Sequence, residues 1–155
     1  MNFMLRTAAQ MLASGWFGAM LLFAFVVAPT AFRVLPGADV AGQMIGPVLR
    51  SIHLFGLLAG VALAGIAWAL GRSRWLIVLP LVLAAGCAFN EFFITAELGN
   101  VLPHEMGGPS PEERAARFAL LHRLSMLIYT AIGLGVAATA IGHARADRSG
   151  PGRWE

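Results

Sequence analysis

The sequence predicts an all-α integral membrane protein, a bundle of four transmembrane helices, and three observations lead to this fold class. Hydrophobic residues make up 58% of the 155 residues and charged residues only 12%, whereas soluble domains average about 25% charged residues. Four apolar runs are each long enough to cross a bilayer as a helix. The arginines stand mostly at the ends of these runs, a pattern that indicates membrane orientation rather than nucleic-acid binding.

The first two predicted spans cover residues 7–29 and residues 40–70. The first run is about 20 residues long, which exceeds the apolar core of a signal peptide, so we expect a helix that stays in the membrane. Pro29 falls where this helix is expected to end. In the second span Gly56 and Gly60 are four residues apart, a spacing that lets another helix approach closely.

The third predicted span covers residues 75–98 and the fourth covers residues 111–142. The Gly- and Pro-rich segment that begins at residue 99 predicts a loop between them. The loop ends in Ser-Pro-Glu-Glu, a strong helix start, because serine can cap the helix and proline suits its first turn. The polar residues 144–155 are expected to be disordered, so the predicted transmembrane domain covers residues 1–143.

The polar residues inside the spans are predicted to lie in one layer. Because successive spans alternate in direction, the end of the first helix, the start of the second, the end of the third and the start of the fourth share one side. Nearly all of these polar residues come from those ends. The predicted intramembrane cluster consists of Arg50, His53, Asn90, Glu91, His122, Arg123 and Ser125. An unpaired charge at mid-bilayer costs about 2.5–3.5 kcal/mol, so we expect Glu91 to pair with Arg50 or Arg123.

The fourth span also carries a polar stripe. Successive steps of four, three and four residues return to the same face of a helix. The residues at this spacing are Phe118, His122, Ser125 and Tyr129. A polar face on a lipid-embedded helix has to contact protein, water or a ligand. The sequence therefore predicts that this face looks toward the other helices.

His53 and His122 are the candidate cofactor-binding residues. Two neutral imidazoles from facing helices could ligate a haem iron or a metal ion. The serine, asparagine and glutamate predicted beside them favour a structural hydrogen-bond network instead, and a path for a proton or a small solute is the third interpretation. We therefore predict no cofactor, with a haem or a metal ion as the alternative.

The sequence contains no arrangement that is typical of an enzyme. We find no nucleophile with a base and an acid at a useful spacing, no phosphate loop and no zinc motif. We therefore predict no catalytic residue and no enzymatic activity. The expected partners are the lipid bilayer and, through the glycine ridges of the first two spans, a second copy of the chain. Nucleic acid is not an expected partner.

The distribution of arginine predicts the orientation of the chain. Six arginines lie at the N-terminus, in the link after the second span and in the C-terminal tail. Five lie on the other side, and two of those five are within helices. Positively charged links stay in the cytoplasm. We therefore expect a multi-pass protein of a bacterial inner membrane with both termini in the cytoplasm.

Several short motifs resemble the bacterial relatives of transmembrane protein 205. They are Gly18, Val27-Ala28-Pro29, Phe32, Leu35, Ala41-Gly42, Asn90 and Phe118-x-x-Leu121-His122-x-x-Ser125-Met126. The chain departs from that family at Ala96, where a proline is frequent, and at Tyr129, where an asparagine is frequent. The resemblance implies a four-span membrane protein of uncharacterised role, for which we expect the handling of a small solute or a part in a stress response.

Overall fold

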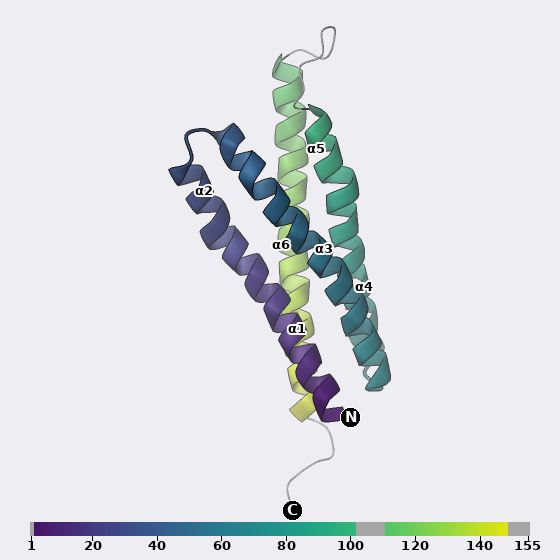
Figure 1. Ribbon diagram of the computed structural model, residues 1–155. Coiled ribbons are helices and arrows are strands. Elements are labelled where there is room, and N and C mark those ends of the chain that lie inside the picture. The colour runs from purple at the N-terminus through teal and green to yellow at the C-terminus, as the bar shows by residue number, and fades with distance from the viewer. Residues whose placement is uncertain (1, 102–110, 149–155) are drawn as a thin grey trace, which may run out of the picture.

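The computed structural model describes residues 2–101 and 111–148, and this part of the chain is helical apart from two short links. The elements are α1 (Asn2–Leu22), η1 (Phe23–Val27), α2 (Ala28–Val34), α3 (Ala38–Ala69), α4 (Arg74–Phe89), η2 (Asn90–Thr95), α5 (Ala96–Val101) and α6 (Pro111–Arg148). They form four long rods that run alternately up and down (Figure 1). Each rod is long and apolar enough to span a membrane, which confirms the predicted all-α four-span fold.

The first rod is longer than the sequence predicted. It runs from Asn2 through α1, η1 and α2 to Val34, and so it continues past Pro29. Proline removes a backbone donor and clashes with the carbonyl four residues earlier. The wider π turn of η1, Phe23–Val27, stands directly before this position and accommodates the proline without ending the rod.

The third and fourth rods also extend beyond their predicted ends. Helix α5 continues to Val101, so residues 99–101 are helical where a loop was expected. Helix α6 continues to Arg148, so residues 144–148 are helical where disorder was expected. Asp147 in the last turn forms an ion pair with a side chain of another rod, which ties this turn to the bundle. The rest of the predicted loop and tail, and the serine cap, lie outside the described residues.

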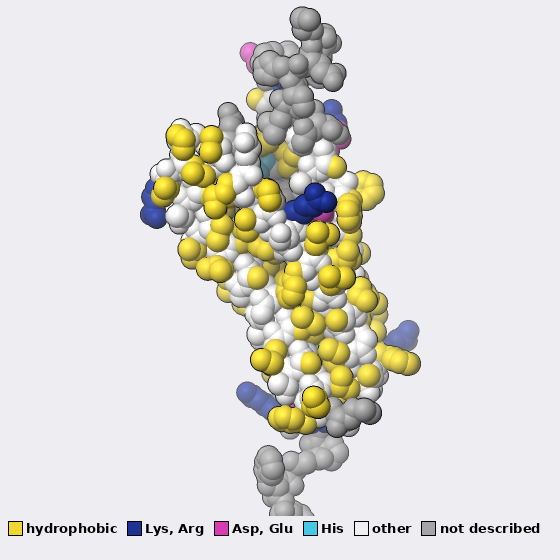
Figure 2. All heavy atoms as spheres, viewed as in Figure 1, with side chains coloured by type: hydrophobic (Ala, Val, Ile, Leu, Met, Phe, Trp, Pro, Cys, Tyr) yellow, Lys and Arg dark blue, Asp and Glu magenta, His cyan; other side chains and the backbone are white. Residues whose placement is uncertain are grey.

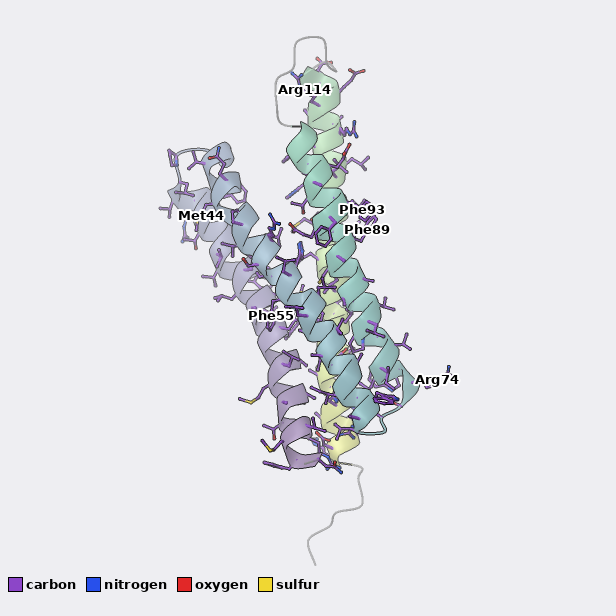
Figure 3. The ribbon with its side chains drawn as sticks, turned by 45° about the vertical axis from the view of Figure 1, so that its right-hand side comes forward. Met44, Phe55, Arg74, Phe89, Phe93 and Arg114 are labelled. Atoms are coloured by element: carbon purple, nitrogen blue, oxygen red, sulfur yellow. The ribbon has the colours of Figure 1, made fainter. Side chains whose placement is uncertain are left out.

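A tight link joins α3 to α4. Gly71 has a φ of 62°, a left-handed conformation that favours glycine and commonly ends a helix. The amide of Arg72 donates to the carbonyl of Ala67 at 2.9 Å, which closes the end of α3. Arg74 then begins α4 at the end of the bundle where α1 begins and α6 ends (Figure 3).

The core of the bundle depends on two glycines in α3. A Cβ on Gly56 would come within 2.7 Å of the Trp16 ring, and a Cβ on Gly60 within 2.5 Å of the Pro80 carbonyl oxygen. The predicted close approach at these glycines therefore occurs within one chain, against α1 and α4. In contrast, a Cβ on Gly15 would meet no atom within 4 Å, so the helix face at this position is open.

The outer surface of the bundle is hydrophobic. Phe25, Leu58 and Trp68 are among many large apolar side chains that remain exposed, and Figure 2 shows them covering the length of the rods. A soluble monomer rarely exposes so continuous an apolar surface. In the upper half of that view, basic and acidic side chains interrupt this surface. The exposed apolar belt therefore fits a multi-pass membrane protein.

Candidate functional site

The polar side chains of α3 and η2 meet inside the bundle. Arg50 and His53 lie one turn apart on α3, and Asn90 and Glu91 are the first two residues of η2. His53 Nδ1 is 3.2 Å from Glu91 Oε2, and Asn90 Nδ2 is 3.1 Å from His53 Nε2. Arg50 Nε is 3.5 Å from Glu91 Oε1. The four residues form what we call the histidine cluster, and the predicted pairing of Glu91 with Arg50 is present.

The hydrogen bonds assign the proton on the imidazole. The amide nitrogen of Asn90 can only donate, so His53 Nε2 accepts its hydrogen bond. His53 Nδ1 must then carry the proton, and it donates to the Glu91 carboxylate. The His53 side chain is only 2% exposed. Three members of the cluster therefore form a buried hydrogen-bonded chain from the Asn90 amide through the imidazole to the Glu91 carboxylate.

The π-helix η2 explains how two consecutive residues reach one ring. On a regular helix successive side chains point about 100° apart, so one of a neighbouring pair usually faces away from the core. A π turn widens the helix, and such turns recur at functional sites. Asn90 and Glu91 are both buried here. The Thr95 hydroxyl donates to the Asn90 carbonyl at 3.0 Å, five residues back, which supports the widened turn.

An aromatic side chain from α6 covers the imidazole. The Tyr129 ring lies edge-on to His53, with 6.4 Å between ring centroids. Its hydroxyl donates to the Met20 carbonyl at 2.8 Å, and its ring lies 6.0 Å from that of Phe23. Tyr129 thus links α6 to the first rod beside the cluster. The predicted stripe of α6 included Tyr129, but nothing in the sequence placed it against His53.

The three predicted members of the intramembrane cluster that belong to α6 differ in burial. The side chains of His122 and Arg123 are exposed, whereas Ser125 is buried on α6. His122 stacks on Phe118 of its own helix, with ring centroids 6.1 Å apart. The prediction that this face of α6 points toward the other helices is therefore correct for Ser125 and Tyr129 and wrong for Phe118 and His122. The reason is packing, since none of residues 112–124 is buried by the described chain.

The two candidate ligand histidines do not form a matching pair in this structure. Both ring nitrogens of His53 are held by hydrogen bonds to Asn90 and Glu91, and His122 lies on the exposed side of α6. A bis-histidine site would require both imidazoles to direct a free lone pair at one ion. Among the described residues, no group of three or more His, Cys, Asp or Glu is arranged to hold a metal ion.

A second polar cluster lies at the opposite end of the bundle, and the sequence did not predict it. Arg72 Nη2 donates to Asp147 Oδ1, and Arg6 Nε is 3.5 Å from the same oxygen. His143 is buried beside this group, at 1% exposure. These residues come from the first rod, the α3–α4 link and the last rod, and they lie far apart in the sequence. One feature of the sequence could have indicated this cluster: Asp147 stands between Arg145 and Arg148.

Comparison with known protein families identifies the family of the chain. The model of the family described as "Domain of unknown function (DUF4149)" matches residues 11–102, more than half of the chain. The matched part contains all four residues of the histidine cluster. No curated protein and no solved structure matches the chain.

Proposed function

We propose that this chain, which belongs to the DUF4149 family, is a non-enzymatic membrane protein that exchanges a proton at the His53–Glu91 pair as it handles a small solute. One observation carries the proposal: an imidazole and a carboxylate lie 3.2 Å apart and buried among membrane-spanning helices. Ionisable side chains in such positions are costly, and they are characteristic of proton and solute paths.

The side-chain amide of Asn90 can form a hydrogen bond with His53 in either protonation state of the imidazole. In the arrangement described, Nδ2 donates to His53 Nε2, and Oδ1 has no hydrogen-bond partner among the described residues. A proton that binds His53 Nε2 turns that nitrogen into a donor. Rotation of the Asn90 amide then presents Oδ1 as the acceptor. The same three side chains therefore satisfy the neutral and the charged imidazole.

Arg50 supports access to this pair from the surface. Its side chain is 64% exposed, whereas that of Glu91 is 7% exposed, and Nε faces Glu91 Oε1 at 3.5 Å. The guanidinium balances the carboxylate charge that the protein interior would otherwise disfavour. A proton that binds His53 Nε2 allows the proton on Nδ1 to pass to the Glu91 carboxylate. The carboxylate, which Arg50 contacts, then exchanges that proton with the surface. Arg50→Gln is therefore expected to slow proton exchange without removing the His53–Glu91 contact.

Proton uptake by the protein reconstituted in vesicles tests this function. A pH-sensitive dye inside the vesicles reports proton entry after a pH step. Glu91→Gln keeps an oxygen that can accept from His53 Nδ1 but removes the carboxylate, so we expect proton entry to fall to the level of empty vesicles. Glu97→Gln is the matched control, because Glu97 pairs with Arg117 outside the histidine cluster, and it should retain the native rate.

The competing interpretation is a structural network that holds α3 and η2 in register. Under that interpretation Glu91→Gln would lower the melting temperature, and native vesicles would pass protons no faster than empty ones. That result overturns the proposed function. Infrared difference spectra after a pH step give a second readout, because a protonating Glu91 carboxylate produces a band that is lost in Glu91→Gln and kept in Glu97→Gln.

The setting we propose is a bacterial inner membrane with both termini in the cytoplasm. Arg6, Arg72, Arg74, Arg145 and Arg148 gather at the end that holds the described ends of α1 and α6, which supports this orientation. The motifs shared with the transmembrane protein 205 relatives support a related role. Membrane-impermeant maleimide on intact cells tests the orientation: Gly37→Cys should react and Ser73→Cys should not, and the reverse pattern overturns it.

A further inference from the structure

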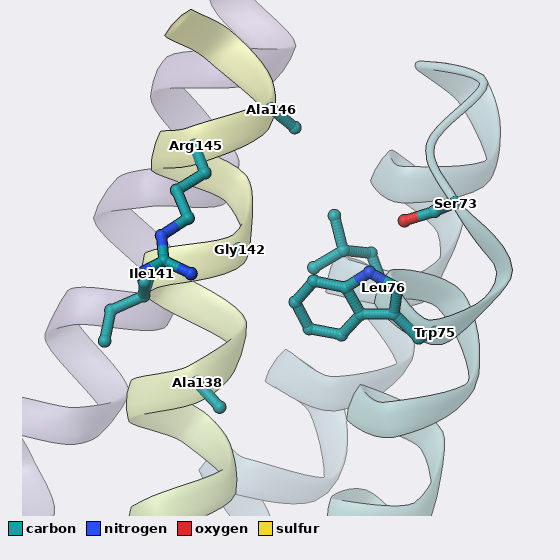
Figure 4. Close-up of a pocket in the computed structure, with 8 residues that line it drawn as sticks. All are labelled: Ser73, Trp75, Leu76, Ala138, Ile141, Gly142, Arg145 and Ala146. Atoms are coloured by element: carbon teal, nitrogen blue, oxygen red, sulfur yellow. The ribbon is translucent and has the colours of Figure 1, made fainter. Parts of the chain in front are cut away.

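A groove separates the start of α4 from the end of α6 (Figure 4). Its volume is ≈ 490 Å³. It lies at the end of the bundle where the α3–α4 link and the last turns of α6 meet. It therefore runs from the edge of the membrane-spanning region toward its interior, at a place distant in the fold from the histidine cluster.

The lining of the groove is apolar along the rods and carries its polar groups toward the end of the bundle. Trp75, Leu76 and Ile141 supply apolar surface, and Ser73 and Arg145 supply polar groups. Trp75 and Ile141 are about half exposed, at 47% and 53%. Tryptophan is typical of the level of lipid headgroups, where its apolar ring meets a polar layer. This order of side chains matches a molecule with a polar head and a hydrocarbon tail.

A glycine determines how the groove is formed. A Cβ on Gly142 would come within 2.0 Å of Trp75 Cη2 and 2.8 Å of Leu76 Cδ2. The indole therefore lies directly on the backbone of α6, as Figure 4 shows with Trp75 facing Gly142. Any side chain at this position would push the indole into the groove. The groove therefore depends on the close packing of α4 against α6 at Gly142.

The charge at this end of the bundle selects the ligand. In the described parts of α1, the α3–α4 link, the first turn of α4 and the last turns of α6, five arginines stand against one acidic residue, Asp147. Basic pockets between membrane helices bind anionic headgroups. We propose that the groove is a binding site for one anionic phospholipid, whose phosphate contacts Arg145 and Ser73 and whose acyl chain lies along Trp75 and Ile141.

The apolar length of the groove distinguishes a lipid from a free anion. A soluble phosphate would contact Arg145 but would leave the half-exposed side chains of Trp75 and Ile141 uncovered. An acyl chain also packs against these two side chains and adds van der Waals contacts that a free anion lacks. The proposal therefore predicts that headgroup charge and acyl chain are both required for binding.

Native mass spectrometry of the purified full-length protein tests the site. The protein is stripped of lipid in detergent and then given phosphatidylglycerol or phosphatidylcholine with identical acyl chains. We expect phosphatidylglycerol to be retained preferentially, and Arg145→Gln to weaken its binding about fivefold, the loss expected for one arginine near an anionic headgroup. Arg74→Gln is the matched control, because Arg74 is exposed at the same end but does not line the groove, and it should change binding less than twofold.

Further measurements distinguish a bound phospholipid from a free anion and from a second copy of the chain. Ala138→Trp fills the groove without changing charge and should abolish retention, while circular dichroism confirms that the helices remain. Inorganic phosphate in excess should not displace the lipid; displacement would identify a simple anion site and overturn the proposal. Equal binding of phosphatidylcholine, or equal losses in Arg145→Gln and Arg74→Gln, would also overturn it. So would a dimer that Ala138→Trp dissociates, because a second copy would then occupy the groove.

Discussion

Asn90 and Glu91 are consecutive in the chain, and both of their side chains contact the single imidazole of His53. The widened turn of η2 makes this possible, since both residues are then buried on the side that faces α3. One nitrogen of the ring accepts from an amide and the other donates to a carboxylate. The arrangement determines which nitrogen carries the proton, and this can be measured directly.

We predict that His53 is neutral with its proton on Nδ1 in the native protein. Nitrogen NMR of histidine-labelled protein in lipid should show this tautomer, and His53→Ala identifies the signal by its loss. Asn90→Leu removes the donor to Nε2, so both tautomers should then be populated. A proton found on Nε2 in the native protein would contradict the assigned hydrogen bonds.

Gly60→Ala should destabilise the bundle. The added Cβ would lie 2.5 Å from the Pro80 carbonyl oxygen, which is backbone and cannot move aside cheaply. Overpacking of this kind costs about 1–3 kcal/mol, and it should appear as a lower melting temperature in detergent. Gly65→Ala is the control on the same helix, because its Cβ meets nothing within 4 Å. It should be neutral or stabilising by up to about 1 kcal/mol.

Tyr129→Phe should cost about 0.5–1.5 kcal/mol of stability, the usual value of one hydrogen bond. The hydroxyl donates to the Met20 carbonyl and so joins α6 to the first rod. Thr130→Val removes a hydroxyl that bonds only within α6 and is exposed, so its effect should stay within about 0.5 kcal/mol. Unfolding in a graded detergent mixture measures both variants. Equal losses of stability in the two variants would show that the hydrogen bond between the two rods does not stabilise the bundle.

Asp147→Asn should loosen the end of the bundle that holds the chain termini. The carboxylate pairs with Arg6 and Arg72, and the Arg72 side chain is only 9% exposed. We expect a loss of about 1–2 kcal/mol, between the values for exposed and buried ion pairs. A double-mutant cycle with Arg72→Gln isolates the pair. Purely additive losses in that cycle would show that the two side chains are not coupled.

Much of the fold was predictable because hydrophobicity is a local property. Each apolar run is long enough to cross the hydrocarbon, and in a membrane such a run satisfies its backbone hydrogen bonds by forming a helix. Four runs joined by short links must alternate in direction. This is why His53 and Glu91, from the second and third runs, could be expected on the same level. The ends of the rods were less predictable, because Pro29 was expected to stop a helix that a π turn allows to continue.

The number of spans, their alternation and the level at which the polar side chains of α3 and η2 meet all follow from the hydropathy pattern of the chain. The packing of the helices was needed to find that Arg50 rather than Arg123 pairs with Glu91 and that His122 is exposed. It was also needed to find that Asp147 joins α6 to α1 and to the α3–α4 link. A hydropathy pattern sets how deep a residue lies along a helix, whereas the direction of its side chain depends on how that helix is rotated against its neighbours.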